Sequence, residues 1–232
     1  MTAGGLRDRL AREARDLYAR GLTTSTGGNL SHRDAGGFRV SATNTAFARQ
    51  LPEDFALCDA GGQRVSGPQP SKEAAFHAAV YRARPEVNAV LHLHAADSLT
   101  LSCLAAPVEE GNVLPVHSSY AVTRVGRVPL LPYLPPGAPE LAQAVGRACR
   151  KVSAVLLQNH GVIAYGGSLR EARDILEELE QNARVWLASR GQARVLSDEE
   201  LAEANGRAQH GAPIAPGEQR PRLRPGIRGW QP

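Results

Sequence analysis

The sequence predicts a single α/β domain in which helices pack in layers against a sheet. Segments with helical periodicity alternate along the chain with short apolar runs that are typical of strands. The chain has 232 residues, of which 42% are hydrophobic. At roughly 100–200 residues per domain, this length fits one domain or two small ones. A folded chain of this size hides roughly 70% of the surface that it exposes when unfolded, so it can form a hydrophobic core.

Helical and strand patterns follow one another through the first half of the chain. Leu6, Leu10, Ala14 and Leu17 recur at spacings of three and four, which predicts an amphipathic helix. A later helix is expected to end at Pro85, because proline cannot continue it. The elements expected here are a helix over 6–22, a small-residue, hydroxyl-rich loop over 23–31, a strand over 38–41, turns over 59–62 and 67–70, a helix over 71–83, a strand over 87–94 and a helix over 95–104.

The second half of the chain contains the longest predicted helix. Ser168 and Glu171 have the spacing of a capping box, and Gly191 is placed to end the helix that the box begins. The elements expected here are a short apolar segment over 130–133, a helix over 140–150, strands over 152–157 and 162–165, a long helix over 168–190 and a short helix that begins at a second capping box over 197–200.

The end of the chain differs in composition from the rest. From residue 206 onward proline, glycine and arginine dominate the sequence. We expect a folded domain over 1–205 and an extended tail over 206–232. Such a tail becomes ordered only where it lies on a neighbouring surface.

Composition and charge exclude several classes of function. The net charge is only +4, the basic residues are spread among carboxylates, and no basic run is interleaved with aromatic residues, so we expect no nucleic-acid partner. No apolar stretch approaches the ~20 residues of a membrane-spanning helix, and the first residues lack a signal-peptide core. A cytoplasmic location is therefore expected. Cys58, Cys103 and Cys149 are widely spaced, so we expect free thiols.

Two histidines lie at the end of an apolar strand. In Leu91-His92-Leu93-His94 the two imidazoles are two residues apart, so on a strand they point to the same face. Neutral imidazole is a good ligand for Zn²⁺ and other late divalent ions. The alternative is that both histidines make ordinary hydrogen bonds on the surface or in the core.

A catalytic metal site needs a third ligand. His160 follows another apolar strand and is flanked by Asn159 and Gly161, so its side chain can face a cleft at the junction of strand and turn. The alternative is a turn histidine that caps a carbonyl. Three protein ligands leave one coordination position open, which is typical of catalytic zinc. His77, in the middle of a predicted helix, is expected to pack or to support the site. The remaining histidines compete for the third position: His32, His117 and His210.

A carboxylate and two polar loops complete the set of candidate residues. Glu73 lies near the start of a predicted helix, where an anion is stabilised, beside Ser71 and Lys72. This segment is suited to hold both a phosphate and a general base, although Glu73 is also explained as an ordinary first-turn carboxylate. Loops rich in backbone and hydroxyl donors, which are suited to cradle a phosphate, occur over 27–31 and 41–44.

Four motifs occur in one order along the chain: Thr26-Gly27-Gly28-Asn29-Leu30-Ser31, Pro70-Ser71-Lys72-Glu73, His92-Leu93-His94 and Asn159-His160-Gly161. This ordered set resembles the class II aldolase/adducin family over about residues 6–205. Within that family the chain looks most similar to the 3-oxo-tetronate 4-phosphate decarboxylases. Further segments that support this resemblance are Tyr81-Arg82-Ala83-Arg84-Pro85, Leu131-Pro132-Tyr133 and Pro136-Gly137-Ala138-Pro139.

The resemblance implies a fold, a cofactor and an assembly. The fold would be a three-layer α/β/α arrangement with a central, largely antiparallel sheet, in a homotetramer with active sites between subunits. Zn²⁺, or another divalent metal, would be held by His92, His94 and His160, with Glu73 as acid/base and as a further ligand when no substrate is bound. The positions that match the family's substrate-phosphate site are Gly28, Asn29, Thr43, Asn44, Ser71 and Lys72.

The resemblance also implies a reaction. It is the zinc-dependent decarboxylation of 3-oxo-tetronate 4-phosphate to dihydroxyacetone phosphate and CO₂, through a metal-stabilised enediolate. Tyr120 matches a family tyrosine that approaches the reacting carbon from the adjacent subunit. Aldolases of the family use a second tyrosine in the C-terminal tail, whereas the sequence after Gly206 has none, which counts against aldol cleavage. The alternatives are an aldolase, epimerase or dehydratase on another sugar phosphate, similar to fuculose 1-phosphate aldolase, and a non-catalytic, adducin-like binding module.

Overall fold

A mixed sheet forms the centre of the protein. The computed structural model describes residues 3–208 and 210–227, and within them the sheet has eight strands in the order β4-β3-β2-β1-β5-β8-β7-β6. Neighbouring strands are antiparallel except for β6 and β7, which are parallel. The strands are β1 (Asn29–Asp34), β2 (Gly37–Ser41), β3 (Phe55–Cys58), β4 (Arg64–Ser66), β5 (Ala89–Leu93), β6 (Leu130–Leu131), β7 (Ala154–Leu157) and β8 (Gly161–Gly166).

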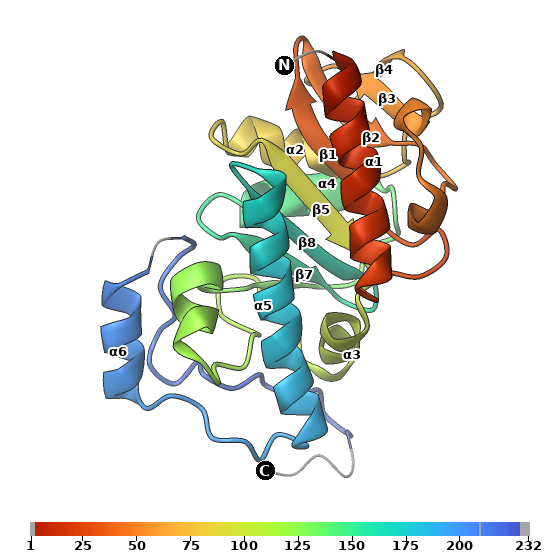
Figure 1. Cartoon of the computed structure of the whole chain (residues 1–232). Helices are drawn as coiled ribbons and strands as arrows, with labels where there is room; N and C mark the ends of the chain where they lie inside the picture. Colours follow the sequence, from red (N-terminus) through yellow and green to blue (C-terminus); the bar gives the residue numbers. More distant parts are fainter. Residues whose placement is uncertain (1–2, 209, 228–232) are drawn as a thin grey trace.

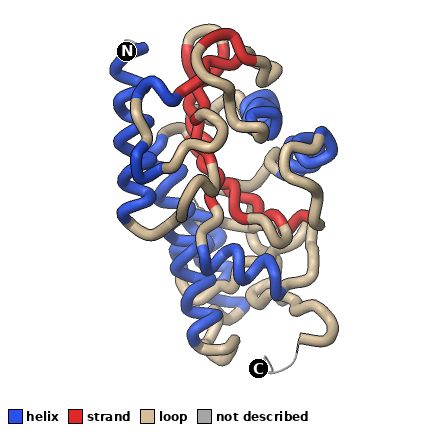
Figure 2. The backbone as a smooth tube through the Cα atoms, turned by 90° about the vertical axis from the view of Figure 1, so that its right-hand side faces the viewer, coloured by secondary structure: helices blue, strands red, loops and turns tan. Residues whose placement is uncertain are grey.

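Helices cover both faces of this sheet, which gives three layers (Figures 1 and 2). Helices α1, α3 and α5 pack on one face, and α2 and α4 pack together on the other. The helices are α1 (Ala3–Ala19), α2 (Ala74–Ala83), α3 (Ala96–Leu104), α4 (Pro139–Ala148), α5 (Leu169–Ala188) and α6 (Asp198–Gly206), and the short turns are η1 (Phe47–Arg49), η2 (Pro52–Asp54) and η3 (Ala121–Val125). The expected three-layer α/β/α fold with a largely antiparallel sheet is confirmed.

The central strands are apolar on both faces because each face has its own core. On β5, Leu91 points into the core beneath α1, α3 and α5, whereas Val90 points into the core beneath α2 and α4. On β8, Val162 points into the core beneath α1, α3 and α5, and Ile163 points into the core beneath α2 and α4. This alternation is the two-residue period of a strand. It places His92, two residues after Val90, on the face that α2 covers, where its ring lies edge-on to Phe76 of α2 with centroids 5.3 Å apart.

Most of the expected elements form, with shifted ends. The first helix ends at Ala19 rather than near residue 22, and the helix expected from residue 71 begins at Ala74. The segment over 23–31 is only partly a loop, because β1 begins at Asn29 within it. Strands β3 and β4, which sequence reasoning did not predict, form a hairpin around the expected turn over 59–62.

The C-terminal tail lies on the body of its own chain. Ile214 is buried, and its backbone N–H and C=O both bond to the Asn205 side chain. Arg220 donates to the backbone oxygen of Gly191, and Leu223 forms a bridge with Ala105. The described part of the tail is irregular and contacts the body at separate points, since Ile214 and Gln219 are buried whereas residues 215–217 and 224–226 are exposed.

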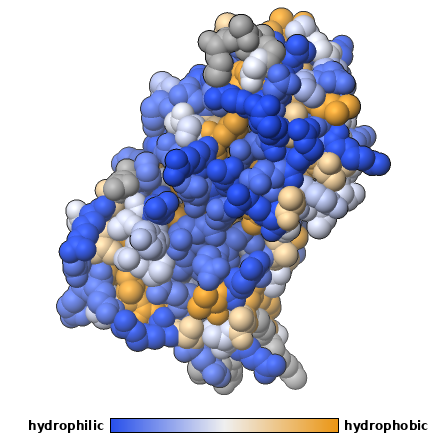
Figure 3. All heavy atoms as spheres, viewed as in Figure 1, coloured by the Kyte–Doolittle hydropathy of each residue, from blue (hydrophilic) through white to orange (hydrophobic). Residues whose placement is uncertain are grey.

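The outer face over α1 and α5 is mostly hydrophilic, with apolar side chains in small scattered groups (Figure 3). The long helix α5 shows why: its apolar positions, among them Ile175, Leu179 and Trp186, face the core, and charged residues occupy the other side. Among the described residues, no helix combines the length and the apolar character that crossing a membrane requires.

Candidate active site

The three histidines meet because β5 and β8 are antiparallel neighbours. His92 lies near the end of β5 and His94 just after it, and His160 comes directly before β8. In the register between these strands Leu93 pairs with Val162, so the end of one strand meets the start of the other. The three ring centroids are 4.8–5.2 Å apart. One nitrogen from each ring lies within 4.8 Å of the others.

The local hydrogen bonds leave lone pairs free at this cluster. His92 is fully buried, and its Nδ1 donates to the backbone oxygen of Val162 at 3.0 Å. Its Nε2 therefore carries a lone pair, and this buried atom has no hydrogen-bond partner. Nε2 of His94 is also buried without a partner. Burial lowers the pKa of His92 to about 3 and also lowers the pKa of His94, so both rings are neutral at pH 7.

Two glycines allow the backbone to pass close to the histidines. Gly28, before β1, has a φ of +89°, and a Cβ there would lie 2.4 Å from the backbone oxygen of His92. A Cβ on Gly161 would lie 2.4 Å from the backbone oxygen of Leu93. Contacts this short exclude any side chain at either position unless the backbone moves. The glycines of the first and fourth sequence motifs thus allow β1 and β8 to pack against the end of β5.

Glu73 brings a carboxylate to the same place from α2. It occupies the N-cap position, one residue before the helix, rather than the first turn. Its Oε1 lies 3.1 Å from Nε2 of His160, and its Oε2 lies 3.4 Å from Nε2 of His92. Asn29 Nδ2 donates to Oε2 at 2.8 Å. Burial raises the pKa of Glu73, but the neighbouring histidines and the donated hydrogen bonds outweigh burial and hold this pKa below its usual value.

This donor set fits a divalent cation. Imidazole nitrogens converge from His92, His94 and His160, of which Nε2 of His92 and Nε2 of His94 have no hydrogen-bond partner, and the Glu73 carboxylate lies beside them. Nitrogen ligands of this kind suit Zn²⁺ and other late divalent ions. In the part of the chain that the structure describes, no other group of three His, Cys, Asp or Glu side chains is close enough to share an ion.

A cavity of about 550 Å³ opens over the cluster. It is lined by all six residues that the family resemblance assigns to phosphate binding, together with Glu73, His94 and His160, whereas His92 is buried and does not line it. Lys72 is exposed at this cavity beside the N-terminus of α2, so the local charge favours an anion. The lining residues are Thr26, Gly27, Gly28, Asn29, Ala42, Thr43, Asn44, Ser71, Lys72, Glu73, His94, Leu99, Tyr133, Pro136, Asn159 and His160.

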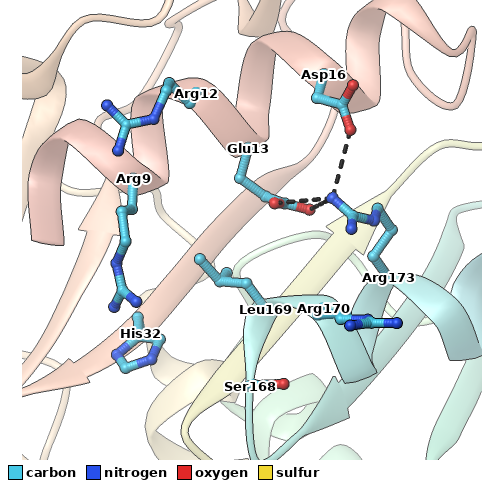
Figure 4. A pocket seen from close by; sticks show the side chains of 9 residues that line it. All are labelled: Arg9, Arg12, Glu13, Asp16, His32, Ser168, Leu169, Arg170 and Arg173. Carbon is cyan, nitrogen blue, oxygen red and sulfur yellow. Dashed lines mark hydrogen bonds and ion pairs between the residues drawn. The ribbon is translucent and has the colours of Figure 1, made fainter.

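A second cavity, of about 520 Å³, lies between α1 and the start of α5 (Figure 4). Four of its nine lining residues are arginines, and Arg173 pairs there with Glu13 at 3.1 Å and with Asp16 at 3.4 Å. His32 also lines this cavity and does not line the one over the three-histidine cluster. Among the described residues, this arginine-lined cavity holds no group of three close metal ligands, in contrast to the first cavity.

The family of the chain follows from a comparison with known proteins. Residues 8–187 match the class II aldolase and adducin N-terminal domain. The chain belongs to the class II aldolase/adducin family. The expected family is thus confirmed, and the four ordered motifs on which it was expected all lie within the matched segment.

Members of this family with different named activities are similar to the chain. A 3-oxo-tetronate 4-phosphate decarboxylase of Haemophilus influenzae is 35% identical over 90% of this chain and 100% of the relative. An L-fuculose phosphate aldolase of Escherichia coli is 33% identical over 84% of this chain and 92% of the relative. The crystal structure of YgbL from Escherichia coli superposes with a TM-score of 0.84 at 35% identity, covering 88% of this chain and 100% of that one.

Two tyrosines differ in their relation to the cavity. Tyr120 precedes η3, is exposed, stacks against Arg124 and does not line the cavity within its own chain. Its catalytic role, which the family resemblance places at an adjacent subunit, stays a prediction. Tyr133 does line the cavity, although sequence reasoning gave it no role at the site. Its position in the sequence could have indicated this place, because Tyr133 comes just after β6. The end of β6 lies beside the end of β7, and His160 follows β7 closely in the sequence.

Proposed function

We propose that the chain is a metal-dependent carbon–carbon lyase that converts 3-oxo-tetronate 4-phosphate to dihydroxyacetone phosphate and CO₂. The observation that carries the proposal is the cluster of the buried His92 with His94, His160 and Glu73, the last three of which line a cavity that also contains Lys72 and several hydroxyl and amide groups. The full-length similarity to a decarboxylase of that name supports the choice of reaction within the family.

We further propose Zn²⁺ as the resident metal, held by His92, His94 and His160. A divalent ion bound there supplies a Lewis acid that polarises the substrate ketone. His92 is a ligand that is already neutral and fixed in orientation, since burial lowers its pKa and a backbone carbonyl holds its Nδ1. This ligand then needs little proton release and little reorganisation when the metal binds.

Glu73 is proposed to move the proton. As an ionised carboxylate it accepts the proton of the C2 hydroxyl. The C1–C2 bond then breaks, CO₂ leaves, and the electron pair passes toward the C3 carbonyl. Protonated Glu73 returns its proton to C2, and a proton from solvent restores the C2 hydroxyl. A pKa held below its usual value keeps Glu73 ionised before the reaction begins, as this order requires.

The phosphate end of the substrate is proposed to lie over the N-terminus of α2. Lys72 supplies a full positive charge, and hydroxyl and amide donors surround the same space. Contacts at this end hold the C3 ketone over the histidine cluster without taking part in bond breaking. The proposed phosphate-binding residues are Gly28, Asn29, Thr43, Asn44, Ser71 and Lys72.

Aldol cleavage of a sugar phosphate is the second candidate, because an L-fuculose phosphate aldolase is similar to the chain at 33% identity. Both reactions leave an electron pair on the carbon next to a polarised ketone, so the same metal and the same base serve both. The test is a panel of phosphorylated four-carbon oxo acids and ketose phosphates, assayed with zinc-loaded protein for CO₂ and for aldehyde. Release of aldehyde without CO₂ would replace the first candidate by the second.

The assembly is proposed to be a homotetramer in the cytoplasm, with no nucleic-acid or membrane partner. The family resemblance supports this assembly, and it would bring a neighbouring copy's Tyr120 toward the cavity. Light scattering of the purified protein measures the oligomeric state directly, and a monomer would remove Tyr120 from the mechanism.

A further inference from the structure

A chain of polar side chains leads from Glu73 away from the cavity into the protein. Asn29 donates to Glu73 at 2.8 Å, and Oδ1 of Asn29 contacts Nε2 of His77. Nδ1 of His77 lies 2.7 Å from Oγ of Ser31, and this Oγ lies 2.8 Å from the Tyr81 hydroxyl. These contacts join β1 to three positions on or next to α2.

The members of this chain are shielded from water. Ser31 and His77 are 0% exposed, Asn29 is 4% exposed and Tyr81 is 5% exposed. A polar group at such a site needs a partner within the protein, because unpaired burial of an amide or hydroxyl costs roughly 1–3 kcal/mol in proteins. Since water is excluded, each group depends on the next member of the chain.

The direction of every hydrogen bond follows from the Glu73 carboxylate. An ionised carboxylate only accepts, so Asn29 offers its NH₂ group to Glu73 and its oxygen to His77. Nε2 of His77 therefore carries the hydrogen, and Nδ1 accepts from the Ser31 hydroxyl. Ser31 has then used its hydrogen, so Tyr81 donates to Ser31 at 2.8 Å, with the Asn88 backbone oxygen as a longer, second acceptor at 3.4 Å. All donors point along one path toward Glu73.

His77 is not a further metal ligand, although it lies behind the cluster. Both of its ring nitrogens are engaged, one by Asn29 and one by Ser31. Its ring stacks on Phe76 with centroids 4.8 Å apart. Burial lowers the pKa of His77 to about 3, which agrees with a neutral ring that donates at one nitrogen and accepts at the other.

We propose that His77, Ser31 and Tyr81 are positioning residues that fix the Asn29 amide so that it donates to Glu73. Without them the amide is free to rotate and to present its oxygen to the carboxylate, which would repel it. The proposal rests on the proposed function only in that Glu73 handles the proton. The orientation of Asn29 itself has a readout that does not depend on turnover.

The first test is nitrogen-15 NMR of the zinc-loaded protein. We expect His77 to be protonated at Nε2 and unprotonated at Nδ1. The matched variants are His77→Gln, whose amide keeps one donor and one acceptor, and His77→Leu, which keeps neither. The Asn29 side-chain amide resonances should shift in His77→Leu and stay close to those of the wild type in His77→Gln. Protonation at Nδ1, or unchanged Asn29 resonances in His77→Leu, would overturn the proposal whether or not the protein is a decarboxylase.

The second test is kinetic and uses a milder change. Tyr81→Phe removes one hydroxyl from the chain, and Tyr165→Phe is its control, because Tyr165 is equally buried but its hydroxyl bonds to the Cys149 carbonyl. We expect kcat to fall by ~10-fold in His77→Leu, the lower end of the range for outer partners of metal sites, and by less in Tyr81→Phe, with KM and zinc content nearly unchanged. Tyr165→Phe should keep its kcat. Wild-type kcat in a folded, zinc-loaded His77→Leu protein would refute the positioning role, whereas an inactive wild type would refute the proposed function alone.

Discussion

Nε2 of His160 lies 3.1 Å from Oε1 of Glu73, although the two residues are far apart in the sequence. This contact joins the start of β8 to the N-cap of α2 across the end of β5. It places a carboxylate, whose pKa the neighbouring groups hold below its usual value, directly beside the candidate metal ligands.

Replacing Glu73 with glutamine tests this arrangement. We expect turnover to fall by roughly 10²-fold or more, because the amide cannot accept and return a proton. Zinc should stay largely bound, because the three imidazoles remain in place. Steady-state kinetics and metal analysis of the same preparation give both numbers. Full activity in Glu73→Gln would exclude this residue as the proton carrier.

Removal of one imidazole tests the metal site. We expect His92→Ala to lose stoichiometric metal, since the two remaining histidines leave an incomplete ligand set. His32→Ala is the matched control, because His32 lies at the arginine-lined cavity and should leave the metal content unchanged. Elemental analysis after dialysis measures both variants. Retention of one zinc per chain by His92→Ala would contradict the assignment.

The two lysines of the chain form a natural pair for testing phosphate recognition. We expect Lys72→Ala to raise the KM for a phosphorylated substrate by ~10-fold or more, since hydrogen bonds to charged groups contribute roughly 1.5–3 kcal/mol. Lys151→Ala removes the same charge away from the cavity and should leave KM unchanged. Equal effects in the two variants would point to general electrostatics rather than to a contact.

The three cysteines should differ in reactivity. Burial raises the pKa of Cys58 and of Cys149 to about 11, and both side chains are inaccessible. Cys103 is partly exposed and accepts a hydrogen bond from Asn159 at the cavity. We expect an aromatic disulfide reagent to titrate one thiol in the native protein, lost in Cys103→Ser, and all three after unfolding. Rapid native reaction of all three would contradict the packing described above.

Glu180 should make stability depend on pH. It is buried and accepts from the backbone N–H groups of Asp97 and Ser98 at the start of α3. Burial is the main cause that raises its pKa above the ordinary 4.5. The folded state therefore keeps the proton to higher pH than the unfolded state does. As the pH rises from the unfolded pKa through the folded pKa, the protein becomes less stable. The free energy of unfolding of the wild type, relative to Glu180→Gln, should fall as the pH is raised above about 4.5. A difference that rises over that range would show that the carboxylate is favoured in the folded state.

The strand that carries the histidine pair was predictable because its signal is local. A two-residue period and a run of apolar neighbours suffice to place His92 and His94 on one face. The polar strand β1 escaped prediction because Asn29, Ser31 and His32 give it no apolar alternation. Strand β4 consists of three exposed residues. Because neither of its faces is buried, its sequence shows no alternation of apolar and polar residues.

Proximity between distant segments was beyond sequence patterns alone. The residues around His160 do not indicate that β8 pairs with β5. The grouping of His160 with His92 and His94 was predicted only from the ordered motifs of the family. The same holds for the hydrogen bonds that connect Ser31, His77 and Tyr81, since each residue by itself is explained by ordinary packing. Helix ends, such as the N-cap position of Glu73, depend on backbone geometry that spacing does not resolve.

The position of β5 between β1 and β8 also has a consequence for biosynthesis. A growing polypeptide that has emerged only as far as α4 already carries two imidazoles and the carboxylate, but lacks the last ligand and the neighbouring strand that would align them. Tight capture of the ion must therefore wait until the C-terminal third has joined the sheet. The rate of metal uptake during refolding would then report the rate at which the sheet is completed.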